Sequence, residues 1–313
     1  MIATTAPFPT RPTAPPPVGL YPAVADIEYR RWAAWSQTDC KTVGRWDQTI
    51  TGCMPAPFQS PAHLLAVLNG HGKPSTPDQE YGTLYHAFLL EPWRVDEQYH
   101  RVLEPINRRT NEGKARWSAL VERFGADRII ESEDWETACA MARAAGDLEQ
   151  VRKYVRAKGD VEISMRWDDP TTGLPCKGRA DKIIRTDAQD ILIDLKTTRC
   201  SHWSSFTVDA AKYGYHVQAA MYADGYEILT GRRPRVLCIA QEKTAPYPAV
   251  VYEWREDEMT SGRVIYRAAL RVIAQCLKTN DWPSYTASVI PMSLPEWGMA
   301  DDATTYEGAD LAD

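Results

Sequence analysis

Two stretches of the sequence indicate the fold. The first is Gly178-Arg179-Ala180-Asp181, and the second, after a polar segment, is Ile191-Leu192-Ile193-Asp194-Leu195-Lys196-Thr197-Thr198. Ile191, Leu192 and Ile193 form an apolar run typical of a strand. The run ends in an acid, one apolar residue and a lysine. Because side chains alternate along a strand, Asp194 and Lys196 are expected on the same face.

The polar segment 185–190 between these two stretches suits a turn. If the stretches form a hairpin centred between residues 187 and 188, Asp181 lies directly opposite Asp194, because the two are equidistant from that centre. Their Cβ atoms would be roughly 4.5–5.5 Å apart, and two carboxylates that close repel each other unless a cation lies between them. Such an all-oxygen site suits Mg²⁺ or Mn²⁺.

Lys196 beside that site could orient or deprotonate a water, or stabilise negative charge in a transition state. The pattern therefore predicts metal-assisted hydrolysis of a phosphodiester. The alternative is an ordinary surface ion pair between Asp194 and Lys196 at a strand end, since Asp-x-Lys alone is a weak motif. The apolar run before the acid and the second acid opposite it both count against that alternative.

Asp181 and Asp194-Leu195-Lys196 resemble the PD-(D/E)XK nuclease motif. The longer context resembles the RecE-type (exonuclease VIII) branch of phage and prophage recombination exonucleases. Four further stretches carry this resemblance, in the family's order, across roughly residues 58–298: Tyr-Gly-Thr-Leu-Tyr-His-Ala-Phe-Leu-Leu-Glu-Pro at 81–92, Thr-Gly-Leu-Pro-Cys-Lys-Gly-Arg at 172–179, Tyr-Gly-Tyr-His-Val-Gln-Ala-Ala-Met-Tyr at 213–222, and Trp-Pro-Ser-Tyr at 282–285.

The resemblance implies an α/β fold of the restriction-endonuclease type, with a central mixed sheet of about five strands flanked by helices. It implies a Mg²⁺-dependent exonuclease (Mn²⁺ could replace Mg²⁺) on linear double-stranded DNA. Digestion would run 5′ to 3′ and leave a 3′ single strand for a partner annealing protein in phage-type recombination. Because related exonucleases form rings, a closed homo-oligomer is expected.

The resemblance also implies roles for single residues. The metal ligands would be Asp181, Asp194, the backbone carbonyl of Leu195, His86 and Glu162. Lys196 would work on the attacking water, and Gln218, Tyr222 and Arg179 would position the substrate. By residue type alone, His86 could be a packed core residue, Glu162 a solvent-facing acid, and the Gln218–Tyr222 pair a packing interface.

The whole chain of 313 residues could hold one large domain or two small ones. Apolar residues make up 44% and charged residues 25%, as in a soluble globular protein. No apolar run approaches the ~18 residues of a membrane span, and residues 1–7 do not resemble a secretory signal. Seven scattered cysteines argue against a disulfide framework or a four-cysteine cluster. The expected compartment is the cytoplasm, that of the bacterial host if the gene is a phage gene.

The net charge of −6 does not indicate a general nucleic-acid binder. Basic residues cluster locally, within 108–116, 152–158 and 232–235, and each cluster is more typical of a solvated surface than of a phosphate track. An acidic balance would suit an enzyme that releases DNA and slides along it.

Residues 1–22 hold seven prolines and are expected to form a disordered arm, while residues 299–313 hold five acids and no base and are expected to form a disordered tail. Residues 23–298 would form a single exonuclease domain. The periodicity predicts helices over 79–92, 133–158, 206–230 and 256–279, and strands over 161–167, 176–181, 235–243 and 247–254. Residues 36–57 have no clear pattern, and by resemblance residues 93–130 would arch towards DNA.

Two other functions fit the same pattern. One is another enzyme on this core, an endonuclease or a CRISPR-associated end-processing nuclease, which linear and covalently closed circular DNA would distinguish. The other is a non-catalytic DNA-binding assembly protein. The acids Asp181 and Asp194 count against it, because a binding module gains nothing from carboxylates placed against phosphate.

Overall fold

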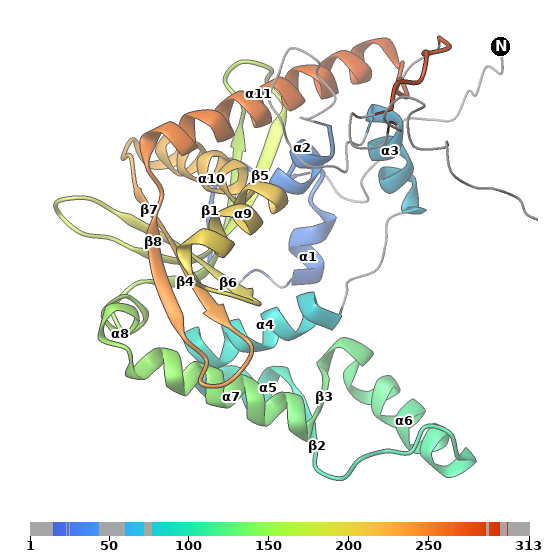
Figure 1. The fold of residues 1–313 in the computed structure, drawn as a ribbon, viewed down its shortest axis with the longest axis vertical. Coiled ribbons are helices and arrows are strands. Elements are labelled where there is room, and N and C mark those ends of the chain that lie inside the picture. Colours follow the sequence, from blue (N-terminus) through green and yellow to red (C-terminus); the bar gives the residue numbers. More distant parts are fainter. Residues whose placement is uncertain are drawn as a thin grey trace, which may run out of the picture.

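The computed structural model describes residues 15–22, 24, 26–43, 60–71, 77–285, 288–294 and 299. Within these residues, six strands form the central sheet in the order β1-β4-β5-β6-β7-β8 (Figure 1). The strands are β1 (Gly19–Tyr21), β4 (Asp160–Asp168), β5 (Pro175–Ile184), β6 (Ile191–Thr198), β7 (Arg235–Glu242) and β8 (Ala249–Glu253). Only the β6–β7 pair among them is parallel. The predicted α/β fold with a mixed sheet is confirmed, with one strand more than expected.

The β5–β6 hairpin has the predicted register. Lys182 pairs with Ile193 and Ile184 with Ile191, which places Asp181 opposite Asp194. The polar turn is held by buried Asp190, which accepts hydrogen bonds from the Thr186 amide (3.1 Å), the Tyr226 hydroxyl (2.8 Å) and Arg232 (2.9 Å). Burial alone would raise the pKa of Asp190, but these donors outweigh it and hold the pKa below its usual value.

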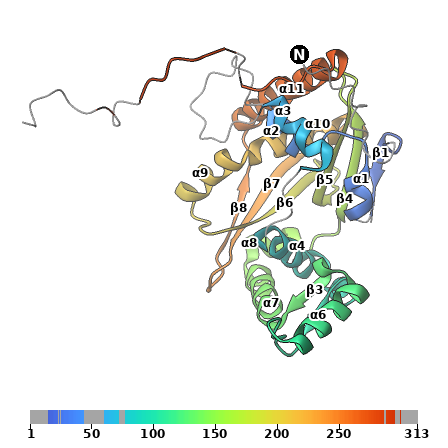
Figure 2. The same ribbon diagram turned by 90° about the vertical axis from the view of Figure 1, so that its right-hand side faces the viewer.

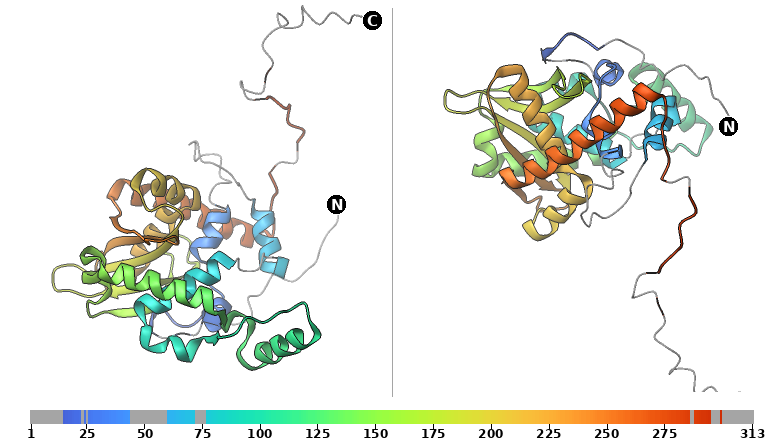
Figure 3. Two further views of the ribbon diagram at one scale, coloured as in Figure 1. Left: turned by 60° about the horizontal axis from the view of Figure 1, so that its bottom comes forward. Right: turned by 90° about the horizontal axis from the view of Figure 1, so that it is seen from above.

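Helices cover both faces of the sheet (Figure 2). One layer contains α2 (Gln37–Val43), α9 (Trp203–Tyr213), α10 (Tyr215–Thr230) and α11 (Glu256–Thr279). The opposite layer contains α4 (Pro77–Leu90), α7 (Ser132–Asp147) and α8 (Glu149–Val155). Met165 and Met221 lie in the core beneath the first layer, whereas Tyr85 and Met141 lie in the core beneath the second. Seen from above, α11 runs across α10 and α2 (Figure 3, right).

A small lobe follows α4 and projects at the bottom of Figure 1. It consists of η2 (Pro92–Arg94), α5 (Val95–Gln98), β2 (His100–Val102), α6 (Asn111–Phe124), η3 (Ala126–Arg128) and β3 (Ile129–Glu131), with β2 and β3 paired in parallel. The approach of this region to DNA stays a prediction. Three short elements complete the described chain: α1 (Asp26–Arg31), α3 (Pro61–Ala66) and η1 (Val67–His71). Among the described residues, none of the helices combines the length and apolar composition that crossing a bilayer requires.

Two predicted helices are each divided in the structure. The segment 133–158 breaks at Leu148, whose backbone is extended (φ −75°, ψ 120°). The segment 206–230 breaks at Gly214, which adopts the left-handed conformation (φ 66°, ψ 41°). The prediction of single helices was wrong. It relied on the apolar periodicity, which continues through both breaks and does not reveal a local change of backbone conformation.

Part of the expected disordered arm is ordered in the structure. Residues 19–21 lie within it but form β1, which pairs with β4 through Gly19↔Arg166 and Tyr21↔Ser164. Without β1, the backbone groups on this side of β4 would be an open sheet edge, and pairing satisfies them. The segment 36–57, which had no assignment, contains α2. Residues 1–14 and 300–313 lie outside the described residues, and the division into arm, domain and tail stays a prediction.

Candidate active site

Three potential metal ligands lie close together among the described residues: His86 of α4, Glu162 of β4 and Asp181 of β5. One ligand atom from each lies within 4.8 Å of the others, and His86 Nδ1 is 3.7 Å from Asp181 Oδ1. The side chains are 20%, 32% and 13% exposed, so the group is reachable from solvent. Two carboxylates are donors that Mg²⁺ and Mn²⁺ prefer, and an imidazole nitrogen also binds divalent metals. This donor set fits a divalent cation.

The strand that carries Glu162 is kinked at this residue. Its φ of 52° lies in the left-handed region, which costs a non-glycine residue about 1–3 kcal/mol. The sequence predicted a regular strand, with Glu162 on the face opposite Ile163. Glu162 does face His86 of α4, on the side opposite Ile163. The alternation fails one residue earlier, since Ile163 packs in the core beneath α10 but Val161 packs in the core beneath α4. The kink therefore occurs where the carboxylate joins His86 and Asp181.

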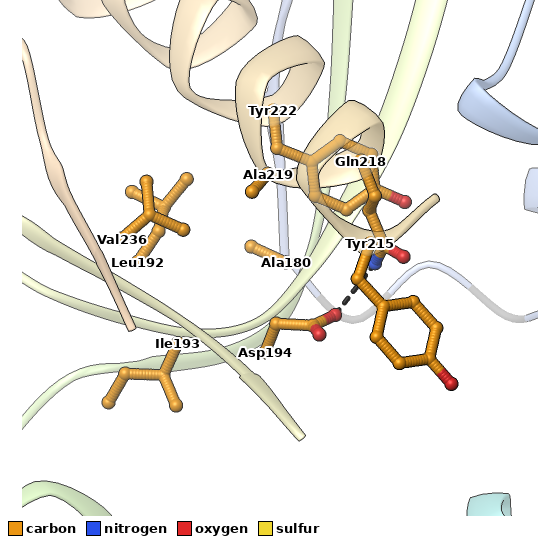
Figure 4. Close-up of a pocket in the computed structure, with 9 residues that line it drawn as sticks. All are labelled: Ala180, Leu192, Ile193, Asp194, Tyr215, Gln218, Ala219, Tyr222 and Val236. Carbon is orange, nitrogen blue, oxygen red and sulfur yellow. Dashed lines mark hydrogen bonds between the residues drawn. The ribbon is translucent and has the colours of Figure 1, made fainter. Parts of the chain in front are cut away.

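Lys196 and Asp194 form a mostly buried ion pair beside this group. Lys196 Nζ lies 2.6 Å from Asp194 Oδ1 and 2.6 Å from Oδ2, and Gln218 Nε2 donates to Oδ1 at 2.7 Å (Figure 4). The side chains of Lys196 and Asp194 are 17% and 18% exposed, so the alternative of a solvated surface pair is wrong. The Leu195 amide donates to Asp181 Oδ2 at 2.6 Å, which fixes one oxygen of that carboxylate.

Asp194 does not belong to the three-residue group found among the described side chains, because its carboxylate is turned towards Lys196 and Gln218. Its predicted role as a metal ligand, and that of the Leu195 carbonyl, stay predictions. Burial raises the pKa of Asp194; Lys196 opposes this shift and Asp181 adds to it. Burial alone would lower the pKa of Lys196, but Asp194 and Asp181 outweigh it and raise that pKa. A protonated Lys196 fits the orientation of water or the stabilisation of charge better than deprotonation of water.

The sequence also matches a known family over most of its length. Residues 54–289 match the model of a PDDEXK-like domain of unknown function, DUF3799. The chain belongs to this family. The match supports the predicted superfamily, while the RecE-type branch stays a prediction. No curated protein matches the chain in sequence.

A solved structure resembles the fold of this PDDEXK-like protein. A candidate exonuclease from Eubacterium rectale superposes with a TM-score of 0.54 at 12% identity, covering 84% of this chain and 91% of its own. The protein SSO0001 (TM-score 0.27, 18% identity, 59% and 85% covered) and VC1899 from Vibrio cholerae (TM-score 0.23, 12% identity, 67% and 59% covered) are more distant. At these identities, the Eubacterium rectale structure supports the fold alone.

Arg179 and Tyr222 lie at the edge of the site, and both contact other parts of the protein. Arg179 donates to Ser164 Oγ (3.0 Å) and the Val24 carbonyl (3.1 Å), and lies 4.0 Å from Glu162 Oε2. Tyr222 is only 9% exposed. Its ring packs so closely on Gly178 that a Cβ there would lie 2.7 Å from it. The contacts of Tyr222, Arg179 and Gln218 with DNA stay predictions.

The sequence reasoning missed two residues of this PDDEXK-like site. The Tyr215 ring lies 5.0 Å from Lys196 Nζ, and Lys41 Nζ lies 5.9 Å from the same ring. Burial raises the pKa of Tyr215 to about 12, with Lys196 opposing the shift, so its hydroxyl stays neutral. Tyr215 could have been found, because it precedes Gln218 by three residues and shares its helix face. Lys41 comes from α2, in a segment without a sequence signal.

Proposed function

We propose that this PDDEXK-like protein is a Mg²⁺-dependent exodeoxyribonuclease that digests linear double-stranded DNA. One observation carries the proposal: His86, Glu162 and Asp181 converge within 4.8 Å beside the buried Lys196–Asp194 pair. A cation site next to a fixed ammonium group suits the hydrolysis of a phosphodiester, whose transition state gains negative charge. Family membership supports a nuclease of this type.

The residues of the chain would divide the work. Asp181, Glu162 and His86 would hold the cation, which when bound polarises the phosphate and lowers the pKa of a bound water. Because the Leu195 amide occupies Asp181 Oδ2, Oδ1 is the oxygen free to face the cation. Lys196 would stabilise the charge that develops on the phosphate. Gln218 keeps Asp194 in place, and Asp194 in turn positions the Lys196 ammonium.

The finer parts of the proposal rest on the resemblance described above. Digestion would run 5′ to 3′ and leave a 3′ single strand for an annealing protein in phage-type recombination. The protein would act as a closed ring of identical subunits in the cytoplasm of a bacterium. Mn²⁺ would replace Mg²⁺, since both accept carboxylate oxygens.

The test uses three DNA substrates with Mg²⁺ present or chelated: linear duplex labelled at the 5′ ends, the same duplex labelled at the 3′ ends, and covalently closed circles. We expect early release of the 5′ label, late release of the 3′ label and intact circles. Asp181→Asn is the matched control, because the amide oxygen can still accept from the Leu195 amide while the charge is lost. No Mg²⁺-dependent digestion, or equal digestion by Asp181→Asn, would refute the proposal. Nicked circles would indicate an endonuclease, and early 3′ release the opposite polarity.

A further inference from the structure

Two tyrosines stack on each other at the break between α9 and α10. Tyr213 ends α9 and Tyr215 begins α10, and their ring centroids lie 5.8 Å apart with planes inclined by 28°. In a continuous helix, residues two apart do not face each other. The left-handed backbone of Gly214 removes the helical relation and brings the rings together. We call this pair the tyrosine platform.

The inner ring of the platform lies against the catalytic residues. Tyr215 lines the same small pocket as Asp194 and Gln218, and its ring points away from α10 (Figure 4). The ring lies 5.0 Å from Lys196 Nζ. Buried Phe206 supports it at 6.1 Å and is itself stacked on Tyr252 at 5.0 Å. The inner ring is therefore held by a packed aromatic cluster.

The outer ring faces solvent among lysines. Tyr213 is 50% exposed, although it lies one ring away from the active site. Lys212 Nζ lies 5.3 Å from the Tyr213 ring and Lys41 Nζ lies 5.9 Å from the Tyr215 ring. The stem of Lys41 packs on Gly214, where an added Cβ would lie 3.3 Å from it. The platform thus combines an exposed aromatic face with positive charge.

We propose that the tyrosine platform binds the nucleobase of a terminal or unpaired nucleotide in the DNA strand that is being cut. The inference rests on the proposed function, because the platform is assigned to the strand being cut from its position next to Lys196. Bases inside a duplex have both faces covered by other bases, so an exposed tyrosine can stack only on an end or on a single strand. Aromatic stacking with nearby cations is the chemistry that holds single-stranded nucleic acid. The platform would give this site a preference for DNA ends.

The test measures binding in Ca²⁺ by fluorescence anisotropy of a duplex with a two-nucleotide single-stranded end. Its partner substrate carries abasic sugars at those two positions. Tyr213→Ala should weaken binding of the normal end by roughly five- to thirtyfold, since one face of the ring is already covered by Tyr215. Tyr213→Phe should bind as the wild type does. The control Val208→Ala, at an exposed position of α9, should have no effect.

The abasic substrate separates stacking from a structural effect. If a base stacks on Tyr213, the wild type should bind the abasic end about as weakly as Tyr213→Ala binds the normal end. Tyr213→Ala should then bind the abasic end only slightly more weakly than either. An unchanged affinity of Tyr213→Ala, or an equal loss on both ends, would overturn the inference. The proposed function is judged separately by Mg²⁺-dependent digestion: a protein that stacks the base but cuts nothing would keep the inference and refute the nuclease.

Discussion

Lys196→Ala should affect stability and chemistry by different physical routes. The mutation removes the ammonium that lies 2.6 Å from both oxygens of Asp194 and leaves that carboxylate held by the Gln218 amide. Breaking a buried ion pair costs roughly 3–5 kcal/mol. Because the pair is 17–18% exposed, we expect a loss of about 2–4 kcal/mol in the free energy of unfolding at neutral pH. The loss should shrink as pH falls, since burial already raises the pKa of Asp194 and protonation removes the uncompensated charge.

The chemical effect should remain when stability is restored. Asp194→Asn/Lys196→Ala removes both charges, so its free energy of unfolding should recover most of the loss. Both variants should nevertheless cleave DNA roughly 10²–10⁴-fold more slowly in single-turnover assays. Lys196→Arg should not rescue the rate, because a planar guanidinium fits a point-charge site poorly. Binding in Ca²⁺ should change little. A single-turnover rate within fivefold of the wild type in Lys196→Ala would refute the catalytic role.

Two predictions concern residues that stabilise the structure around the site. Asp190→Asn should destabilise the protein by roughly 1–3 kcal/mol, because Tyr226 and the other donors bond the ionised carboxylate. Since the folded pKa is depressed, the difference from wild type in urea denaturation should be constant near neutrality and shrink below the ordinary value of 3.8. Gly178→Ala should cost roughly 1–3 kcal/mol through its clash with Tyr222, whereas Gly146→Ala in α7, with open space around its Cβ, should be neutral or stabilising in thermal denaturation. A Gly178→Ala protein as stable as the Gly146→Ala control would contradict the close packing.

The sequence predicted the hairpin from the apolar run 191–193 and the polar segment 185–190 that precedes it. A turn centred between residues 187 and 188 sets Asp181 opposite Asp194, and a one-residue slip would reverse every side chain. The observed pairs Lys182↔Ile193 and Ile184↔Ile191 have that register. Local pattern was sufficient here because the two strands are adjacent in the chain.

The sequence could not predict the contacts that depend on tertiary packing. Asp194 accepts a hydrogen bond from Gln218 of α10 as well as from its neighbour Lys196, and this contact between a strand and a helix could not be predicted. The lack of a side chain at Gly178 lets the Tyr222 ring pack on β5, and this contact could not be predicted either. Neither choice is visible in the spacing of residues along one element.

Two of the places where the regular pattern fails lie at the candidate site. At Glu162 the strand departs from regular alternation, with a left-handed backbone at the residue whose carboxylate joins Asp181 and His86. A continuous helix through Gly214 would have turned Tyr213 and Tyr215 away from each other, and the left-handed glycine stacks them beside Lys196. Backbone strain at a non-glycine residue such as Glu162 persists only where surrounding contacts impose it, and departures from local rules are expected to gather at functional sites. The kink at Glu162 and the break at Gly214 therefore point to one site, with the cation ligands on one side of Lys196 and the tyrosine platform adjoining it.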